Sequence, residues 1–191
     1  MKQKKGPVYQ GRIISGRYKG RKGKYQPSAA LRPTPDRLKE TLFNWLMAQV
    51  SDAVCLDLFA GTGLLGLEAL SRGAAQVVFV DQEAAHIAAL TTLLAAWGAA
   101  PHAKLYQAIV PGQCAFLKAF RFDIVFLDPP FAEPIHGQVL QALMQWGCVD
   151  SNTTLYCQWP KQSGPPDLGP HWMMERHYRA GIAMGGLFRH V

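Results

Sequence analysis

The residues with the most specific chemical potential are Asp128, Pro129, Pro130 and Phe131, which follow an apolar run over residues 122–127. A continuous apolar run of this length predicts a strand that is buried on both faces of a sheet. The two prolines must end that strand, because proline cannot donate to a sheet ladder and fixes its own φ. We therefore expect an acidic side chain and free carbonyl groups at the carboxyl end of a strand, where ligands bind in open α/β sheets.

Such a turn suits methyl transfer to a planar exocyclic amine. The lone pair of that nitrogen is delocalised into its ring, so the nitrogen is a poor nucleophile until acceptors hold its two hydrogens in a pyramidal geometry. The Asp128 carboxylate and the Pro129 carbonyl could be these acceptors, and Phe131 could stack on the base, which is worth roughly 1–3 kcal/mol. The alternative is a structural strand end followed by a surface turn.

A second candidate site is the glycine-rich loop that follows an apolar strand expected at residues 53–59. Its glycines let the backbone turn tightly and approach a ligand, and the helix that follows presents free amides. Asp81 ends the next expected strand, where it can accept hydrogen bonds from ribose hydroxyls. The candidate cofactor residues on this loop are Asp57, Phe59, Ala60, Gly61, Thr62 and Gly63.

The spacing of these glycines leaves two cofactors open. Gly61, Gly63 and Gly66, with an acid 20 residues after Gly61, also satisfy the fingerprint of a dinucleotide-binding site. An acid at Asp57 would disfavour a pyrophosphate, but it can accept a hydrogen bond from the amino group of a methionine moiety. Together with the Asp128 turn and a closing hairpin after the fifth strand, this favours S-adenosylmethionine.

The elements that must position these residues alternate between strand and helix from residue 53 onward. This βαβ alternation predicts an α/β fold with a mainly parallel sheet and helices on both faces. Residues 172–179 and 182–189 have no helix between them and predict a closing antiparallel hairpin about Gly181. The expected strands span 53–59, 76–80, 104–108, 122–127 and 153–159, and the expected helices span 34–49, 64–71, 83–97 and 137–146.

Charge is distributed unevenly along the 191 residues, whose formal net charge is +7. Residues 1–39 contain 12 of the 20 lysines and arginines and a single acid, Asp36. The asymmetry indicates a polyanionic partner. Residues 12–25 combine these cations with two tyrosines and several glycines, which predicts a small β-hairpin that can grip phosphates and stack bases. A solvated basic tail is the alternative.

Composition excludes several other classes of protein. A hydrophobic content of 49% with 17% charged residues is that of a packed globular chain. The four cysteines and six histidines have no metal-ligand spacing, so we assign no metal and expect buried, reduced thiols in a reducing cytoplasm. No apolar run is long enough for a membrane span. We divide the chain into a mobile N-terminus (1–11), a basic extension (12–33) and an α/β domain (34–191).

The chain resembles a known family, the bacterial RsmD methyltransferases, which modify the exocyclic N2 of a guanine in small-subunit (16S) ribosomal RNA. The resemblance covers residues 12–189, and the N-terminal block is its most specific part because other amine methyltransferases share only the Asp-Pro-Pro-Phe turn. The motifs that carry the resemblance are Arg12-Ile13-Ile14-Ser15-Gly16, Gly20-Arg21-Lys22, Leu31-Arg32-Pro33-Thr34, Asp36-Arg37, Glu40-Thr41-Leu42-Phe43-Asn44-Trp45-Leu46, residues 56–63, Leu67-Glu68-Ala69-Leu70-Ser71-Arg72-Gly73 and Asp128-Pro129-Pro130-Phe131.

This resemblance implies a Rossmann-like class I S-adenosylmethionine-dependent methyltransferase with a seven-stranded sheet and an N-terminal RNA-binding β-hairpin. It implies action on an assembled or assembling 30S particle, and we expect a monomer. The cofactor site would add Gln82, Gln107 and Ala108 to the loop and Asp81, and Asp128 to Phe131 would hold the guanine. The residues expected to contact RNA are Arg12, Arg17, Tyr18, Lys19, Arg21, Lys22, Lys24, Arg32 and Arg37.

Three positions depart from the family pattern. Gln107 stands where Asp or Asn is frequent near the adenine, Gln158 where Glu is common, and Phe188 where the C-terminal motif has Tyr. Because none of the three removes Asp128 or the glycine loop, we still expect activity.

Three other functions stay open: an amine methyltransferase acting on DNA, one acting on protein glutamine, and a non-catalytic RNA-binding factor with a retained cofactor fold.

Overall fold

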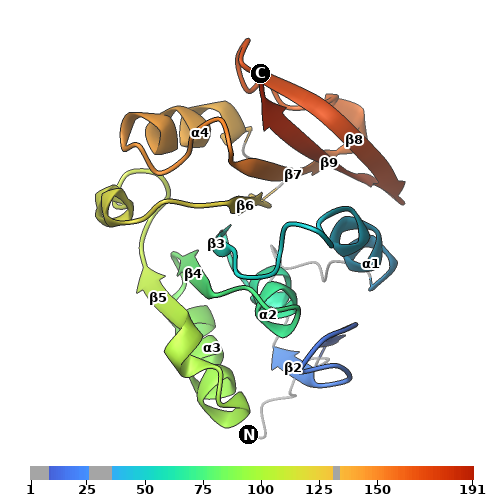
Figure 1. Cartoon of the computed structure of the whole chain (residues 1–191), viewed down its shortest axis with the longest axis vertical. Coiled ribbons are helices and arrows are strands. Elements are labelled where there is room, and N and C mark those ends of the chain that lie inside the picture. The colour runs from blue at the N-terminus through green and yellow to red at the C-terminus, as the bar shows by residue number, and fades with distance from the viewer. Residues whose placement is uncertain (1–8, 26–35, 131–133) are drawn as a thin grey trace, which may run out of the picture.

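The computed structural model describes residues 9–25, 36–130 and 134–191. Within these ranges the chain forms a two-stranded ribbon and a seven-stranded sheet with helices on both faces (Figure 1). The strands are β1 (Tyr9–Arg12), β2 (Lys22–Tyr25), β3 (Val54–Leu58), β4 (Gln76–Asp81), β5 (Ala103–Gln107), β6 (Ile124–Leu127), β7 (Thr154–Pro160), β8 (Trp172–Ala180) and β9 (Ala183–His190). The α-helices are α1 (Asp36–Trp45), α2 (Leu64–Ser71), α3 (Ala84–Trp97) and α4 (His136–Gln145), and the short 3-10 helices are η1 (Ala100–His102), η2 (Ala115–Ala119) and η3 (Lys161–Ser163).

The large sheet has the strand order β5-β4-β3-β6-β7-β9-β8. Strands β3 to β7 run parallel to one another, and β9 pairs antiparallel with both β7 and β8. The predicted α/β architecture with its closing antiparallel hairpin is thereby confirmed. The chain winds from β3 toward β5 on one side and from β6 toward β8 on the other, so the topological switch point, where ligands bind in such sheets, lies between β3 and β6.

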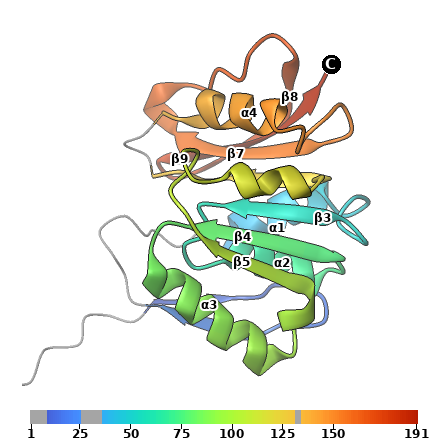
Figure 2. The same cartoon turned by 90° about the vertical axis from the view of Figure 1, so that its left-hand side faces the viewer.

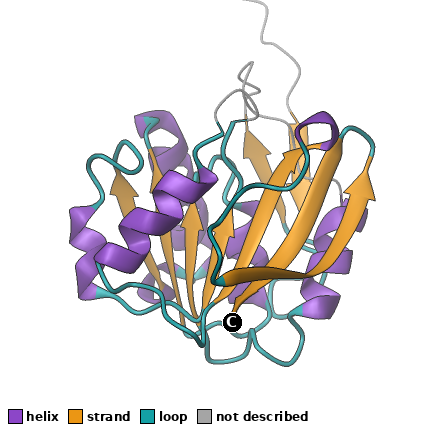
Figure 3. Cartoon of the chain, turned by 90° about the horizontal axis from the view of Figure 1, so that it is seen from above, coloured by secondary structure: helices purple, strands orange, loops and turns teal. Residues whose placement is uncertain are grey.

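Two hydrophobic cores lie on the two faces of the sheet. One contains Leu42 of α1, Leu67 of α2 and Leu90 of α3, and the other contains Val139 of α4 and Leu117 of η2. Figure 3 shows the strands side by side between these helical layers. Both faces of β3, β4 and β6 are therefore covered, which explains why these strands are apolar along nearly their whole length.

The N-terminal ribbon packs along the outside of α2 and α3 (Figure 2). A Cβ at Gly11 would fall 2.2 Å from the side chain of Leu64, and one at Gly23 would contact Leu93 at 3.7 Å. With this cover, all eight residues of α2 are buried, including Glu68 and Ser71. The close approach of β1 to α2 depends on glycine at position 11.

The element bounds differ from the sequence expectations mainly at the N-terminus. Strand β1 begins at Tyr9, so residues 9–11 belong to the ribbon rather than to a mobile N-terminus. The nine residues between β1 and β2 form a long loop in place of a tight turn. The helix expected over 34–49 ends its regular part at Trp45 and continues as turns, and its expected start at Thr34 lies outside the described residues.

The cysteines agree with the expectation of buried thiols. Cys55, Cys114, Cys148 and Cys157 are all buried free thiols. Among the described helices, none is long and apolar enough to cross a membrane.

Candidate active site

The carboxyl ends of three neighbouring strands bring the acids together. Leu58, the last residue of β3, pairs with Val80 of β4 on one side and with Leu127 of β6 on the other. Asp81 and Asp128 each follow one of these paired residues, so they stand at the same level on either side of the chain leaving β3. This is the arrangement expected from the sequence, at the switch point of the sheet.

The loop after β3 has the tight backbone expected for a ligand cradle. Phe59, Gly61 and Gly63 have positive φ angles of 80°, 52° and 70°. Such a conformation is uncommon for a residue with a Cβ such as Phe59, and it is often found at functional sites. The amides of Phe59 and Ala60 donate to the carbonyl of Val80 at 3.1 and 2.9 Å, which fastens the loop to β4.

The carboxylate of Asp81 contacts three groups at this edge of the sheet. Its Oδ2 accepts a hydrogen bond from the amide of Gly61 at 2.6 Å, and its Oδ1 accepts one from the amide of Glu83 at 2.8 Å. The Nδ1 atom of His86 lies 3.0 Å from the same Oδ1. The carboxylate therefore ties the glycine loop to the start of α3.

Asp57 lies deeper than the sequence suggests. It is a residue of β3 rather than of the loop, it is buried, and its Oδ2 accepts from the amide of Gly66 at 2.9 Å. Burial raises the pKa of Asp57 to about 8, and the negative charges of Asp128 and Asp81 act in the same direction against the Gly66 hydrogen bond. An arriving cation would favour ionisation of this carboxyl.

The turn predicted to be catalytic begins where β6 ends. Asp128 is half-buried, and the surrounding protein raises the pKa of its carboxyl to about 7 by desolvation. Pro129 is buried and Pro130 is half-buried. The fourth residue of the predicted site, Phe131, lies outside the described part of the chain.

The residues expected near an adenine lie at the adjoining strand end. The amide of Ala108 donates to the carbonyl of Asp81 at 3.0 Å, and the Gln107 side-chain amide donates to the carbonyl of Gln82 at 3.3 Å. Gln82 and Gln107 are exposed. The structure thus brings the whole predicted cofactor set to the ends of β3, β4 and β5.

The sequence does not predict a buried cluster of two hydroxyl groups beside Asp128. The Tyr156 hydroxyl donates to Oε1 of Gln158 at 3.1 Å and lies 2.7 Å from the Tyr178 hydroxyl. The amide oxygen can only accept, so Tyr178 must donate to Tyr156. A Cβ at Gly185 would fall 2.5 Å from the Tyr178 hydroxyl, so glycine makes room for this ring. No local pattern predicts the cluster, because its members come from β7, β8 and β9.

His136 begins α4 next to this cluster. It is buried, and its Nε2 donates to the carbonyl of Gln158 at 2.9 Å. Burial lowers the pKa of His136. The histidine therefore fastens α4 to β7, as a structural residue at a helix start.

The predicted RNA contacts divide into three groups. Arg17, Lys19, Arg21, Lys22 and Arg37 are exposed, and Arg12 is exposed but paired with Asp36 at 2.7 Å. The side chain of Lys24, and Arg32 as a whole, fall outside what the structure describes. The loop of the ribbon that carries Arg17 and Lys19 lies against Ser71, at the end of α2 remote from the glycine loop.

The expectation that Tyr18 stacks on bases is wrong. Its side chain is buried, with 4% of the residue exposed, and its ring packs 5.6 Å from the ring of Trp97. The guanidinium of Arg21 lies over both rings, at 5.3 Å from Tyr18 and 5.6 Å from Trp97. Tyr18 therefore anchors the loop in the core and leaves the cation outside.

No cluster of three or more His, Cys, Asp or Glu side chains that could hold a metal ion occurs in the described ranges. Asp57 and Asp81 at this edge accept hydrogen bonds from backbone amides. Their chemistry is that of a site for hydroxyl and amino groups.

The seven-stranded sheet order with an antiparallel β9, the glycine loop after β3 and the acid at the end of β4 define the class I S-adenosylmethionine-dependent methyltransferase fold. A solved RNA methyltransferase from Salinibacter ruber, in complex with S-adenosyl-L-homocysteine, shares this fold with a TM-score of 0.63 at 15% identity, covering 82% of this chain and 92% of that one. A putative methyltransferase from Escherichia coli is more similar. Its TM-score is 0.81 at 33% identity, with 95% of this chain and 98% of that one covered.

The chain belongs to the RsmD family, whose sequence pattern, described as Conserved hypothetical protein 95, matches residues 11–189. The ribosomal RNA small subunit methyltransferase D of Escherichia coli is 38% identical over 172 residues, which cover 89% of this chain and 85% of the relative. The enzyme of the same name from Haemophilus influenzae is 37% identical over 185 residues, 93% of each chain. The resemblance predicted from the motifs is thus confirmed, and the protein is a methyltransferase.

Proposed function

We propose that this methyltransferase transfers a methyl group from S-adenosylmethionine to the exocyclic N2 of a guanine in small-subunit ribosomal RNA, within an assembled or assembling particle. The observation that carries the proposal is the placement of Asp81 and Asp128 on either side of the chain that leaves β3. One acid is fastened to a glycine loop suited to a cofactor, and the other begins a turn suited to a planar amine.

The residues present fit S-adenosylmethionine. Asp81 offers carboxylate oxygens to ribose hydroxyls, the amides around Gly61 and Gly63 allow close approach, and the second oxygen of Asp57 is available to an amino group. Burial already disfavours the ionised form of Asp57, and a pyrophosphate would disfavour it further, whereas a cationic amino group would favour it, which argues for S-adenosylmethionine over a dinucleotide. When bound, the cofactor supplies the electrophilic methyl group.

Asp128 has the central role in the reaction. Its carboxylate and the Pro129 carbonyl would accept hydrogen bonds from the two N2 hydrogens of guanine and turn the nitrogen lone pair toward the methyl group. The base must leave its stack, at a cost of about a few kcal/mol that is smallest for an unpaired nucleotide. Most of the rate comes from this positioning, and the proton leaves after transfer, so no strong general base is required.

The basic surface supports an RNA substrate. Arg17, Lys19 and Lys22 stand exposed on the ribbon, and Arg37 stands exposed on α1. Cations of this kind bind phosphates without reading sequence. The loop that carries Arg17 and Lys19 lies against Ser71 at the far end of α2, whose eight residues span roughly 12 Å at about 1.5 Å per residue. A substrate that contacts both this loop and the glycine loop must span that length. An RNA in a particle, bound by a monomer of this chain, meets that requirement.

The names of the relatives also favour RNA over the two other amine substrates. The relatives from Escherichia coli and Haemophilus influenzae are named as ribosomal RNA methyltransferases. A protein glutamine does not account for the cations of the ribbon loop, whereas the phosphates of DNA would bind them as those of RNA do, so the names of the relatives are what favours RNA over DNA.

The test is to incubate the protein with methyl-labelled S-adenosylmethionine and with small ribosomal subunits from cells that lack this activity. Free ribosomal RNA, duplex DNA and a glutamine-containing protein are offered in parallel. We expect label only in ribosomal RNA, recovered after digestion as N2-methylguanosine. Label in another nucleoside would overturn the target, and label only in DNA or protein would overturn the substrate class.

A further inference from the structure

Helix α2 connects the two functional parts of the molecule. Its first residues follow the glycine loop, and the amide of Gly66 is bound by Asp57. Its last turn faces the N-terminal extension, by which we mean β1, β2 and the loop between them. Three polar side chains in this short helix segment, Glu68, Ser71 and Arg72, have no part in the cofactor site, although they belong to a motif that the sequence singles out.

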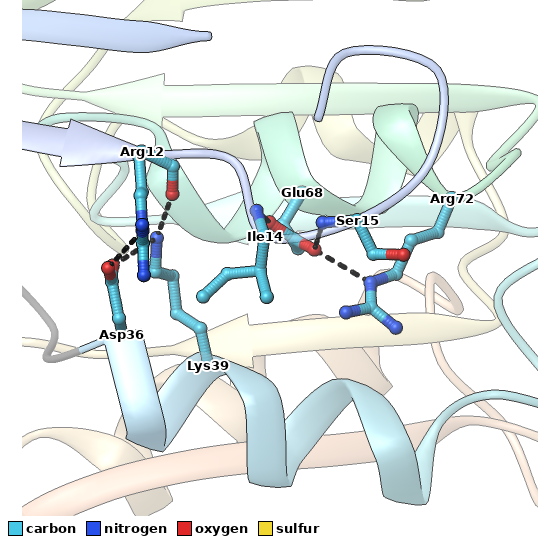
Figure 4. Close-up of polar contacts among 7 residues, drawn as sticks. All are labelled: Arg12, Ile14, Ser15, Asp36, Lys39, Glu68 and Arg72. Carbon is cyan, nitrogen blue, oxygen red and sulfur yellow. Dashed lines mark hydrogen bonds and ion pairs between the residues drawn. The ribbon is translucent and has the colours of Figure 1, made fainter. Parts of the chain in front are cut away.

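Glu68 binds the extension through its backbone. The carboxylate is wholly buried, its Oε2 accepts from the amide of Ile14 at 2.7 Å, and its Oε1 accepts from the amide of Ser15 at 3.1 Å (Figure 4). Arg72 donates to the same Oε1 at 2.7 Å. Three donors thus satisfy one buried carboxylate, and two of them are consecutive amides, which fixes the direction of the chain as well as its position.

Ser71 continues the attachment one turn further on. Its hydroxyl accepts from the amide of Tyr18 at 2.9 Å and donates to the carbonyl of Ser15 at 2.5 Å. Its own carbonyl accepts from the amide of Arg17 at 2.7 Å. Gly16 has a φ of 80°, and a Cβ there would fall 1.8 Å from the carbonyl oxygen of Ser71, so only glycine permits this approach of the loop to α2.

Helix α1 provides a second attachment, through Lys39. This lysine is wholly buried, and its Nζ donates to the carbonyl of Arg12 at 2.5 Å and lies 3.4 Å from Oδ1 of Asp36. Asp36 in turn binds Arg12 at 2.7 Å (Figure 4). Desolvation lowers the pKa of Lys39.

The extension needs these contacts because it has little internal stability. Its two strands are four residues long, and an isolated two-stranded hairpin is marginal in water. Only Ile13 and Tyr18 of its loop are buried side chains. The position of the loop cations is therefore set by the polar side chains of α2 and α1 together with the buried Ile13 and Tyr18, rather than by the pairing of the ribbon strands.

We propose that Glu68 is a positioning residue for RNA recognition, which holds the backbone of Ile14 and Ser15 and thereby fixes the loop cations relative to the cofactor loop at the other end of α2. This inference rests on the proposed function. The buried Glu68 carboxylate accepts hydrogen bonds from two amides of a distant segment, and these directional bonds define one position of the loop on α2. An apolar side chain would make no directional contact and would allow the loop to shift along the helix.

Glu68→Gln tests the proposal because it keeps the shape of the side chain. In one orientation the amide nitrogen of the glutamine faces the Ile14 amide, and in the other it faces both the Ser15 amide and Arg72, so at least one donor loses its acceptor. Loss of such contacts with a charged group corresponds to about a 10-fold or larger effect. Glu175→Gln is the matched control, since it removes the same charge from an exposed residue on β8 that pairs with Arg189.

We expect Glu68→Gln to raise KM for small ribosomal subunits by about 10-fold or more, while kcat and the Kd of S-adenosylmethionine change less than about twofold. The Ile14 and Ser15 amides should lose protection from hydrogen exchange, and Glu175→Gln should behave as wild type. If the Ile14 and Ser15 amides lose their protection in Glu68→Gln but KM for small ribosomal subunits stays unchanged, the proposal is wrong. A parallel loss of cofactor affinity would also contradict the proposal, because Glu68 would then be a general structural residue.

Ser71→Ala keeps the test decisive if Glu68→Gln does not fold. It removes two loop contacts without burying a mismatched donor, and we expect a smaller rise in KM with cofactor affinity unchanged. An unchanged KM in Ser71→Ala would then contradict the proposal. If wild type itself methylates no ribosomal RNA, the proposed function fails first, and direct binding of small-subunit RNA by both proteins decides whether Glu68 still positions the cations.

Discussion

The carboxylate of Asp81 accepts a hydrogen bond from the backbone amide of Gly61 at 2.6 Å. This contact joins the end of β4 to the loop after β3, so the cofactor loop is held in its tight conformation by the same acid that is suited to a ribose. Preorganisation of this kind reduces the cost of binding, since the loop need not be ordered by the ligand.

Removal of that carboxylate should weaken the binding of S-adenosylmethionine. Asp81→Ala loses the hydrogen bonds to the amides of Gly61 and Glu83, and we expect the Kd to rise about 10- to 100-fold, because a hydrogen bond to a charged group contributes about 1.5–3 kcal/mol. His86→Ala, which removes one contact with Oδ1 of Asp81, should raise the Kd less. Titration calorimetry measures both, and wild-type affinity in Asp81→Ala would contradict the role.

The rate of methyl transfer should depend on pH through Asp128. Only the ionised carboxylate accepts hydrogen bonds from both an amine and its neighbours, and the pKa of this group is raised to about 7. We expect kcat at saturating cofactor to rise from pH 6 to a plateau above about pH 8, with an apparent pKa near 7. Single-turnover rates across this range give the profile, and a rate that falls over the same interval would exclude Asp128 as the acceptor.

Stability should depend on pH in the opposite sense through Asp57. The pKa of its carboxyl is about 8 in the folded protein against an ordinary value of 3.8, so between these values the folded state holds a proton that the unfolded state has lost. The free energy of unfolding therefore decreases as pH rises from about 4 to about 8. Asp57→Asn should flatten this part of the curve in urea unfolding. An equally steep curve in the variant would show that Asp57 is not its source.

The glycine loop should tolerate no side chain at position 63. Gly63 has a φ of 70°, and a Cβ would fall 2.3 Å from Leu90, so Gly63→Ala adds a clash to the backbone strain. Gly98→Ala is the matched control, because its φ is 68° but its Cβ would meet nothing within 4 Å. We expect the control to cost about 1 kcal/mol and Gly63→Ala to cost about 2–4 kcal/mol in urea unfolding. Equal costs would show that Leu90 moves aside freely.

The fold and the catalytic edge are largely predictable from sequence because local signals determine them. Helix α2 has the predicted bounds, since glycines stand before Leu64 and after Ser71 and the residues between them favour a helix. Asp81 and Asp128 follow apolar strands, and parallel strands bring their carboxyl ends to one edge. That edge is therefore fixed by chain order alone.

Long-range contacts account for what the sequence does not predict. Tyr18 stands among cations, as a base-stacking residue would, but Trp97 lies 79 positions away and provides the pocket that buries it. Glu68 resembles an ordinary partner for Arg72 one turn away, and its binding to Ile14 depends on the extension folding back over α2. An acid within an otherwise apolar helix is the one available signal that its carboxylate has a buried partner.

The central claim is that Asp128 holds the amine that receives the methyl group, and one measurement tests it most directly. Single-turnover methylation of small ribosomal subunits is compared between wild type, Asp128→Ala and Asp123→Ala, the last of which removes an exposed acid just before β6. The account predicts that Asp128→Ala loses methyl transfer while the Kd of S-adenosylmethionine stays within a few-fold of wild type, and that Asp123→Ala retains transfer. Normal turnover in Asp128→Ala would contradict the account.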